Sequence, residues 1–362
     1  MSPQTRSARV AGTGSFLPPD RVDNRALFRR PSIRENFDVE RARGSLKDVE
    51  DAAALEPEEV FDLWARQVTG IEERRVVPED GEGLDPEAMS SEAARRALQR
   101  AGMEASDLDF IVAVSLTTSH EVPNLACTVA DRLGVPHVGG FTMNAACAGF
   151  VYGLTAGYAH VRAGLGDNVL VVCSDALSRI TDYTDPKTAV LFADGAGSAV
   201  LVPSPEGEGV LGRPYTEADY VYEHLNLRGQ GWESADEPRP KLHMGGGPHV
   251  LRQAIQAMSR VAGAALETTD LTWADIDYVV PHQANLRITR GLERVLPLEK
   301  GRVVHTIQRY GNLSASTVGV ALDEVLRGGH GELPDPTRIV LTAVGGGYTS
   351  AGMVLSLSPS AP

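Results

Sequence analysis

A cysteine at position 147 occupies a segment whose residue types could support nucleophilic chemistry. The segment Met143–Phe150 reads Met-Asn-Ala-Ala-Cys-Ala-Gly-Phe, and apolar side chains then recur at steps of three and four. That spacing predicts a helix over residues 147–163, with Asn144 as its N-cap and Cys147 in the first turn. The free N–H groups and partial positive charge there favour thiolate over thiol and could hold an oxyanion. Cys147 is therefore a candidate nucleophile, with a small buried structural cysteine as the alternative.

Two polar residues follow segments that should be buried. His282 follows the apolar strand predicted at 278–280 and Pro281, and Asn312 lies in a Gly-containing loop that leads into a predicted helix at 317–326. Each residue alone is more often part of a loop or a core than a catalyst, so their roles stay open at this point.

The sequence does not favour a metal or a bound cofactor. The remaining histidines show no ligand spacing, and no Cys/His cluster suits zinc. Gly12-Thr13-Gly14 lacks the third glycine of a dinucleotide-binding loop, and no Gly-Lys-Ser/Thr phosphate loop occurs. Cys127, in a predicted helix, and Cys173, in an apolar strand, are expected to be structural.

The elements that must position these side chains alternate between strand-like and helix-like segments, which predicts an α/β fold with a largely parallel or mixed sheet. Asp107–Val114 resembles Asp275–His282, which lies 168 residues later. Two further pairs match in the same order: 169–174 with 339–344, and 197–201 with 352–355. We therefore predict two similar halves, 1–205 with the cysteine and 206–362 with His282 and Asn312, a chance match of apolar strands being the alternative.

The segment Arg21–Gln67 does not fit this repeat. It is charged and helix-prone, and it contains few large apolar residues. We expect either a solvated surface excursion or a cap over the entrance of an active site.

Composition narrows the class of protein further. The chain has 362 residues, 42% of them hydrophobic, and a formal net charge of −14, which disfavours a general nucleic-acid binder. No apolar run approaches the roughly 18 residues needed to span a bilayer, and the first residues contain no apolar segment typical of a signal peptide. Three sparse cysteines suit a reducing compartment. These features predict a cytoplasmic, globular enzyme.

Taken together, the motifs resemble the condensing enzymes of the thiolase superfamily, and most closely β-ketoacyl-acyl carrier protein synthase III. The matching motifs are Thr69–Arg75, Asn144–Phe150, Thr188–Leu201, Pro281–Ile288, Tyr310–Asn312 and Gly345–Thr349. They extend over residues 8–20 and 64–356, nearly everything outside the charged insert. The resemblance implies a five-layered αβαβα thiolase-like fold of two duplicated halves with mixed sheets.

The resemblance also implies a catalytic triad of Cys147, His282 and Asn312. Cys147 would accept an acyl group from a coenzyme A or carrier-protein thioester, with the N–H groups of Cys147 and Gly346 as the oxyanion hole. His282 and Asn312 would hold the enolate formed when a malonyl unit loses CO2, and that enolate attacks the acyl-cysteine. The implied partners are acyl-CoA or acyl carrier protein, malonyl-acyl carrier protein and a second copy in a homodimer, without a cofactor or metal.

Related branches remain as alternatives. Asn312 favours carbon–carbon bond formation over an acyltransferase that delivers the acyl group to an alcohol or amine. The hydroxymethylglutaryl-CoA synthase branch needs a glutamate upstream of the cysteine, where residues 113–119 read Ala-Val-Ser-Leu-Thr-Thr-Ser. The head-to-head branch uses a glutamate just before a loop proline, where this chain has Val122 with Glu121 one residue earlier. A non-catalytic partner subunit is disfavoured by the complete triad.

The sequence departs from the family pattern at positions that concern substrate binding. Trp64 matches a tryptophan that contacts the adenine of coenzyme A in the family, whereas Val68 and Ser350 replace an arginine and a tryptophan. With the long insert, these changes predict a paralogue in polyketide or other specialised metabolism, with a primary fatty-acid initiation enzyme as the alternative. We also predict that Val122 and Phe150 contact the substrate. At the position of Val122, the family sets pocket depth across the dimer interface.

Acyl carrier proteins are strongly acidic, so an acidic enzyme needs a local basic patch to dock one. Arg287, Arg290 and Arg294 fall at helical steps of three and four soon after His282. We predict that they form a docking face near the mouth of the site, an ordinary solvated helix face being the alternative.

Overall fold

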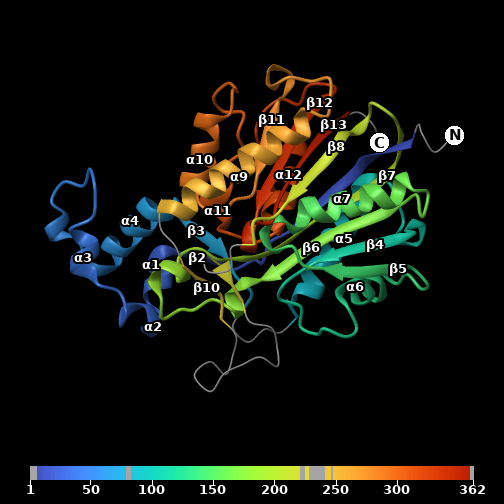
Figure 1. Ribbon diagram of the computed structural model, residues 1–362. Helices are drawn as coiled ribbons and strands as arrows, with labels where there is room; N and C mark the ends of the chain where they lie inside the picture. Colours follow the sequence, from blue (N-terminus) through green and yellow to red (C-terminus); the bar gives the residue numbers. More distant parts are fainter. Residues whose placement is uncertain (1–5, 79–82, 221–224, 228–240, 246–247, 359–362) are drawn as a thin grey trace.

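Two β-sheets form the centre of the molecule (Figure 1). The computed structural model describes residues 6–78, 83–220, 225–227, 241–245 and 248–358. The first sheet has the strand order β1 (Arg6–Phe16), β7 (Asp194–Pro205), β6 (Val169–Ala176), β4 (Phe110–Val114) and β5 (Gly139–Met143). The second has the order β11 (Tyr278–Pro281), β12 (Thr337–Val344), β13 (Ser350–Leu357) and β8 (Gly209–Glu217).

The two sheets repeat one pattern of pairing. In the first sheet β4 runs parallel to β6, and β6 pairs antiparallel with β7. In the second, β11 runs parallel to β12, and β12 pairs antiparallel with β13. These are the strands that the internal repeat relates, so the predicted duplication with mixed sheets is confirmed.

Helices make the other three layers. The outer face of the first sheet is covered by α5 (Pro86–Ala101) and α6 (Leu125–Leu133), and that of the second by α9 (Pro248–Leu266) and α10 (Leu286–Val295). Between the sheets lie α7 (Gly149–Arg162) and α12 (Ser316–Leu326), which share the largest apolar core with both sheets. Ten of the eleven residues of α12 are buried, as expected for a helix enclosed on both sides. The resulting order of layers is αβαβα, as predicted.

The middle layer joins the two halves through a close contact of glycines. A Cβ atom on Gly197 of β7 would lie only 2.9 Å from the Cα of Gly319 in α12, and one on Gly319 would lie 3.0 Å from the Cα of Gly197. Any larger residue at either position would force the helix off the strand. This contact helps to hold the loop that precedes α12, and with it Asn312, against the first half.

The charged insert folds into short helices at one side of the sheets, drawn in blue in Figure 1. They are α1 (Asn24–Phe28), α2 (Pro31–Arg34), α3 (Val39–Arg43) and α4 (Pro57–Thr69). The rings of Phe28, Phe37, Phe61 and Trp64 pack together, with centroids 4.9–6.1 Å apart. This cluster also includes Val190, so the insert is anchored on the first half and is more than a solvated excursion.

The remaining elements are short. They are β2 (Arg21–Asp23), β3 (Glu73–Arg75), β9 (Leu225–Asn226), β10 (His243–Met244), α8 (Pro186–Ala189) and α11 (Ile307–Tyr310). Within the part of the chain that the structure describes, no helix combines the length and apolar character needed to cross a membrane.

Candidate active site

Cys147 lies in a single 3₁₀ turn, Ala146–Ala148, directly before α7. Asn144 does not cap α7. Its Oδ1 accepts the N–H of Ala146 at 2.9 Å and closes a tight turn ahead of the cysteine, where Ala146 has a φ of 47°. The helix therefore begins two residues later than predicted. Cys147 sits on the bend that leads into the helix, inside the molecule.

Burial determines the protonation state of this cysteine. Only 7% of Cys147 is exposed. Burial raises the pKa of its thiol to about 12; the nearby Ser314 hydroxyl lowers the pKa, and the charge of Asp175 raises it. A backbone N–H group lowers the pKa of the thiol, in the direction expected at the start of a helix, but desolvation outweighs this effect. A reaction at this sulfur would therefore require removal of its proton.

His282 follows β11 directly, as predicted, and is 1% exposed. Its Nδ1 lies 2.6 Å from Oγ1 of Thr317 at the start of α12, which fixes the plane of the ring. Burial lowers the pKa of His282 to about 3, so the imidazole is neutral at physiological pH. A neutral ring can exchange hydrogen bonds with substrate without adding a charge to the buried site.

Asn312 is buried in the loop between α11 and α12. Its N–H donates to the carbonyl of Leu191 at 3.0 Å, which ties the loop to the first half. Its side-chain Oδ1 accepts the N–H of Ser314 at 2.9 Å. With the oxygen engaged, the carboxamide NH2 is left to donate to a ligand.

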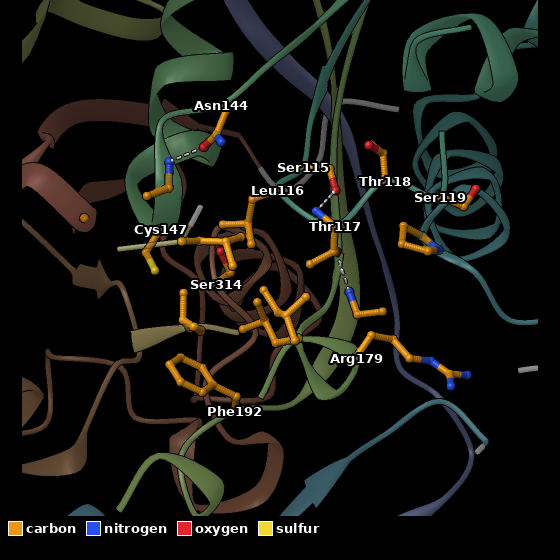
Figure 2. Close-up of a pocket in the computed structure, with 18 of the residues that line it drawn as sticks. Ser115, Leu116, Thr117, Thr118, Ser119, Asn144, Cys147, Arg179, Phe192 and Ser314 are labelled. Atoms are coloured by element: carbon orange, nitrogen blue, oxygen red, sulfur yellow. Dashed lines mark hydrogen bonds between the residues drawn. The ribbon is translucent and has the colours of Figure 1, made fainter. Parts of the chain in front are cut away.

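Two cavities meet at the cysteine. One, of about 460 Å³, is lined by Cys147, His282 and Asn312 together and is called here the donor cavity. The other, of about 700 Å³, is called here the acyl chamber, and Figure 2 shows Cys147 and Ser314 facing the segment Ser115–Ser119 within it. Four residues border both cavities: Cys147, Phe192, Leu225 and Gly346. The structure thus brings the three predicted catalytic residues to one place.

A glycine turn packs against the backbone of the cysteine. It follows β12 and continues into the 3₁₀ turn Gly346–Tyr348. A Cβ atom on Gly345 would lie 2.7 Å from the backbone nitrogen of Cys147, so only glycine fits there. The N–H of Gly345 donates to the carbonyl of Thr349 at 2.8 Å. The N–H of Gly346 is therefore the better candidate for the second oxyanion donor beside that of Cys147.

The other predicted contact residues lie in different surroundings. Trp64 lines the donor cavity. Val122 is 87% exposed and lines neither cavity of its own chain. Phe150 is fully buried in the core between the sheets and also lines neither cavity, so a substrate contact is not proposed for it.

The three arginines are exposed on α10 at the predicted spacing, and Arg287 lines the donor cavity. Within the described ranges, no group of three or more His, Cys, Asp and Glu side chains is arranged to hold a metal ion.

Sequence reasoning missed three residues next to the triad: Asp175, Ser314 and Thr317. Ser314 and Thr317 belong to the loop and helix that follow Asn312, where a hydroxyl carries little signal by itself. Asp175 near the end of β6 offered a clearer one, because a carboxylate two residues beyond an apolar run is seldom buried without a reason.

Comparison with known proteins agrees with this geometry. Residues 141–215 match the family model for 3-oxoacyl-[acyl-carrier-protein] synthase III, and residues 266–357 match that of its C-terminal part. The chain is 34% identical over 354 residues to β-ketoacyl-[acyl-carrier-protein] synthase III of Geobacillus kaustophilus, covering 96% of this chain and 98% of the relative.

Solved structures give the same picture. The priming β-ketosynthase from the R1128 polyketide biosynthetic pathway superimposes with a TM-score of 0.82 at 31% identity, covering 98% of both chains. The 3-oxoacyl-(acyl carrier protein) synthase III of Pseudomonas aeruginosa PAO1 superimposes with a TM-score of 0.80 at 31% identity, covering 97% of this chain and 98% of that one. The chain therefore belongs to the β-ketoacyl-acyl carrier protein synthase III family of the thiolase superfamily and is an acyl-transferring condensing enzyme.

Proposed function

We propose that this enzyme loads an acyl group onto Cys147 and condenses it with a carrier-bound malonyl unit by decarboxylative Claisen chemistry. The observation that carries the proposal is the convergence of Cys147, His282 and Asn312 on one cavity that opens into a second at the sulfur. Two cavities meeting at one nucleophile suit a reaction that joins two substrates. The chemistry needs thioester substrates and no further cofactor.

In the first step the sulfur of Cys147 attacks the acyl thioester, whose carbonyl oxygen becomes an oxyanion. The backbone N–H groups of Cys147 and Gly346 would donate to it. The tetrahedral adduct collapses, the C–S bond to the incoming carrier breaks, and the released thiolate takes a proton from water. The acyl chain then extends from Cys147 into the acyl chamber.

In the second step malonyl thioester enters the donor cavity. The C–C bond to its carboxylate breaks, CO2 leaves, and the electron pair moves onto the thioester oxygen as an enolate. The Asn312 NH2 and the His282 ring would donate hydrogen bonds to that oxygen. The enolate carbon attacks the acyl carbon on Cys147, and the sulfur leaves as a thiolate.

The proposed substrates are inferred from the two cavities and from the exposed arginines beside the donor cavity. We propose acyl-CoA or an acyl carrier protein as the acyl donor and malonyl-acyl carrier protein as the extender. The exposed arginines of α10 would meet the acidic carrier at the mouth of the donor cavity. The likeness to a polyketide priming β-ketosynthase supports specialised metabolism, and primary fatty-acid initiation is the alternative.

We further propose a homodimer in which the loop bearing Val122 covers the partner's acyl chamber. The resemblance to the family, in which this position sets pocket depth across the dimer interface, supports this proposal, and the 87% exposure of Val122 leaves it accessible to a second copy. We also retain 1–205 and 206–362 as the two halves of the proposed domain organisation, because the strands of the first sheet end at residue 205 and those of the second begin at 209.

The test is intact-protein mass spectrometry after incubation with a panel of acyl-CoA and acyl-carrier thioesters, combined with measurement of CO2 release from malonyl-carrier protein. The wild type should gain one acyl mass, and Cys147→Ala should gain none. Asn312→Ala should still acylate but lose CO2 release. Acyl loading without CO2 release by the wild type would favour transfer to an alcohol or amine. Failure to acylate with any thioester would contradict catalysis altogether.

A further inference from the structure

A buried carboxyl group lies close to the nucleophile and has no role in the chemistry above. Asp175, in β6, is 1% exposed. Its Oδ1 accepts three hydrogen bonds from one segment, at 2.9–3.1 Å: from the Ser115 hydroxyl, the Leu116 N–H and the Thr117 hydroxyl. This oxygen holds the segment that forms one wall of the acyl chamber.

The other carboxyl oxygen is in a different situation. Oδ2 of Asp175 is fully buried and has no hydrogen-bond partner in the described structure. The hydroxyl of Ser314 is likewise buried without a partner that meets the usual distance and angle limits. Leaving two buried polar atoms unsatisfied is costly, and such atoms often mark a functional arrangement.

Ser314 lies between Asp175 and the nucleophile. It borders the acyl chamber beside Cys147, as Figure 2 shows, and its hydroxyl is near enough to both groups to lower the pKa of each. Its φ of 55° is unusual for a serine, so the loop holds the side chain here at some cost. A hydroxyl in this position can relay a proton between the sulfur and the carboxyl of Asp175.

The surroundings leave Asp175 as a base that can act near neutral pH. Burial raises the pKa of Asp175 to about 6, and its hydrogen bonds offset part of that effect. Among the described residues no cation pairs with it, and the titratable groups whose pKa responds to its charge are the thiols of Cys147 and Cys173. Cys173 is fully buried and donates to the carbonyl of Gly197. The pKa of His282, about 3, makes the imidazole the weaker base.

We propose that Asp175 and Ser314 form a proton path to Cys147 that is separate from His282 and Asn312. The S–H bond of Cys147 breaks as its proton moves to the Ser314 oxygen, and the proton of Ser314 moves to Oδ2 of Asp175. The negative charge passes from the carboxylate to the sulfur as the sulfur attacks the thioester. Ser314 regains a proton for the one it gives up, so it ends unchanged.

The path also balances over the proposed reaction cycle, on which this part of the inference rests. While the acyl group occupies the sulfur, Asp175 can release its proton to water, because its pKa of about 6 leaves the carboxyl mostly ionised at neutral pH. When the enolate displaces the sulfur, the Cys147 thiolate regains a proton through the same path, from Ser314 and Asp175. The thiolate released in the loading step takes its proton from water, so one proton is consumed per cycle.

Alkylation of Cys147 by iodoacetamide tests the path without any thioester. The rate is measured from pH 5 to 9 on the full chain carrying Cys127→Ala, which removes the exposed thiol, with the modified site located by peptide mass mapping. With Asp175 as base, the rate follows the product of ionised Asp175 and protonated Cys147. That product is constant between their pKa values of about 6 and about 12. A plateau above pH 6 is therefore expected.

Asp175→Asn should replace the plateau by a rate that rises about tenfold per pH unit, because only pre-formed thiolate then reacts. Ser314→Ala should behave in the same way while leaving the carboxyl in place, which covers the case in which Asp175→Asn does not fold. Ser115→Ala is the control that removes a hydrogen bond to Asp175 without breaking the path. Since that bond lowers the pKa of Asp175, its plateau should persist and begin at a higher pH.

A plateau that survives in both Asp175→Asn and Ser314→Ala would overturn the proposal. So would a tenfold rise per pH unit in the wild type, or loss of the plateau in Ser115→Ala, which would indicate a merely structural role. None of these outcomes bears on CO2 release, so failure of the proton path and failure of the proposed condensation are distinguishable.

Discussion

The acyl chamber and the donor cavity share the sulfur of Cys147 but differ in their chemistry. The chamber side contains an ionisable carboxyl, Asp175, with Ser314 and the hydroxyl-rich segment Ser115–Ser119. The donor side contains the neutral His282 and the carboxamide of Asn312. The difference suggests a division of labour, in which one side handles the proton of the nucleophile and the other stabilises the enolate without adding a competing base.

The walls of the two cavities also come from different parts of the fold. Segments of the first half make most of the chamber: 84–86, 115–121, 144–147, 176–180 and Phe192. Segments of the second half make most of the donor cavity, among them α9, α10, residues 282–285 and the glycine turn, and the first half contributes Trp64 and α8 among others. Substitutions should therefore fall into three groups, acting on the shared boundary, on one side, or on the surface beside it.

The largest effect is expected at the boundary. Gly345→Ala places a methyl group 2.7 Å from the nitrogen of Cys147 and so shifts both nucleophile and oxyanion donors. Loading and condensation should each fall by more than about 10³-fold, because misplacement and loss of an oxyanion donor each cost roughly 10²-fold. Rapid-quench mass spectrometry gives the loading rate. Gly263→Ala in α9, where a methyl group meets nothing within 4 Å, is the matched control. Loss of only one of the two steps would argue against a shared boundary.

The next largest effect should be confined to the donor side. Asn312→Asp keeps an oxygen for the N–H of Ser314 but replaces the donating NH2 by a carboxylate that repels the enolate. CO2 release should fall about 10²-fold above the pKa of the new carboxyl and recover partly as the pH is lowered, since the protonated acid donates again. Acyl loading should survive. A parallel loss of loading would show that the two sides are not independent.

Substitutions in the acyl chamber should change the preference of the enzyme for acyl chain length. Leu116→Phe reduces the space in the acyl chamber and should shift the preference toward shorter acyl donors by about tenfold in kcat/KM, with the KM for carrier-bound malonate unchanged. Val250→Phe in the donor cavity is the counterpart. It should raise that KM and leave chain-length preference as it was. If a competition assay shows the reverse pattern, the acyl chain and the malonyl thioester occupy the opposite cavities.

The smallest effect is expected on the surface. Arg290→Glu with Arg294→Glu should raise the KM for carrier-bound malonate about threefold to tenfold, with a smaller effect at high salt. Alkylation of Cys147 should not change. The control with the same change in charge is Arg213→Glu with Lys300→Glu, two exposed residues outside α10. An equal rise of KM in the control would show that the effect comes from the change in net charge alone. No rise of KM in the α10 variant would contradict docking on α10.

Sequence reasoning predicted those parts of the site whose positions follow from local sequence patterns. His282 could be placed at a strand end because the apolar run before it is unambiguous, and the internal repeat predicted the two related sheets. The protonation of Cys147 could not be predicted, because desolvation depends on the segments around Ser314 and Gly345 that fold over it. The role of Asp175 was equally hidden, since burial of its two oxygens arises from contacts 58 to 60 residues away and from Ser314.

The contact between Gly197 and Gly319 has a consequence for the engineering of the chain. Backbone meets backbone there with no side chain between, so each half alone would expose this stretch of backbone to water. The covalent link at the exposed turn Glu206–Glu208 is thus less important than the contact, and a chain cut at that turn should stay assembled and accept acyl groups.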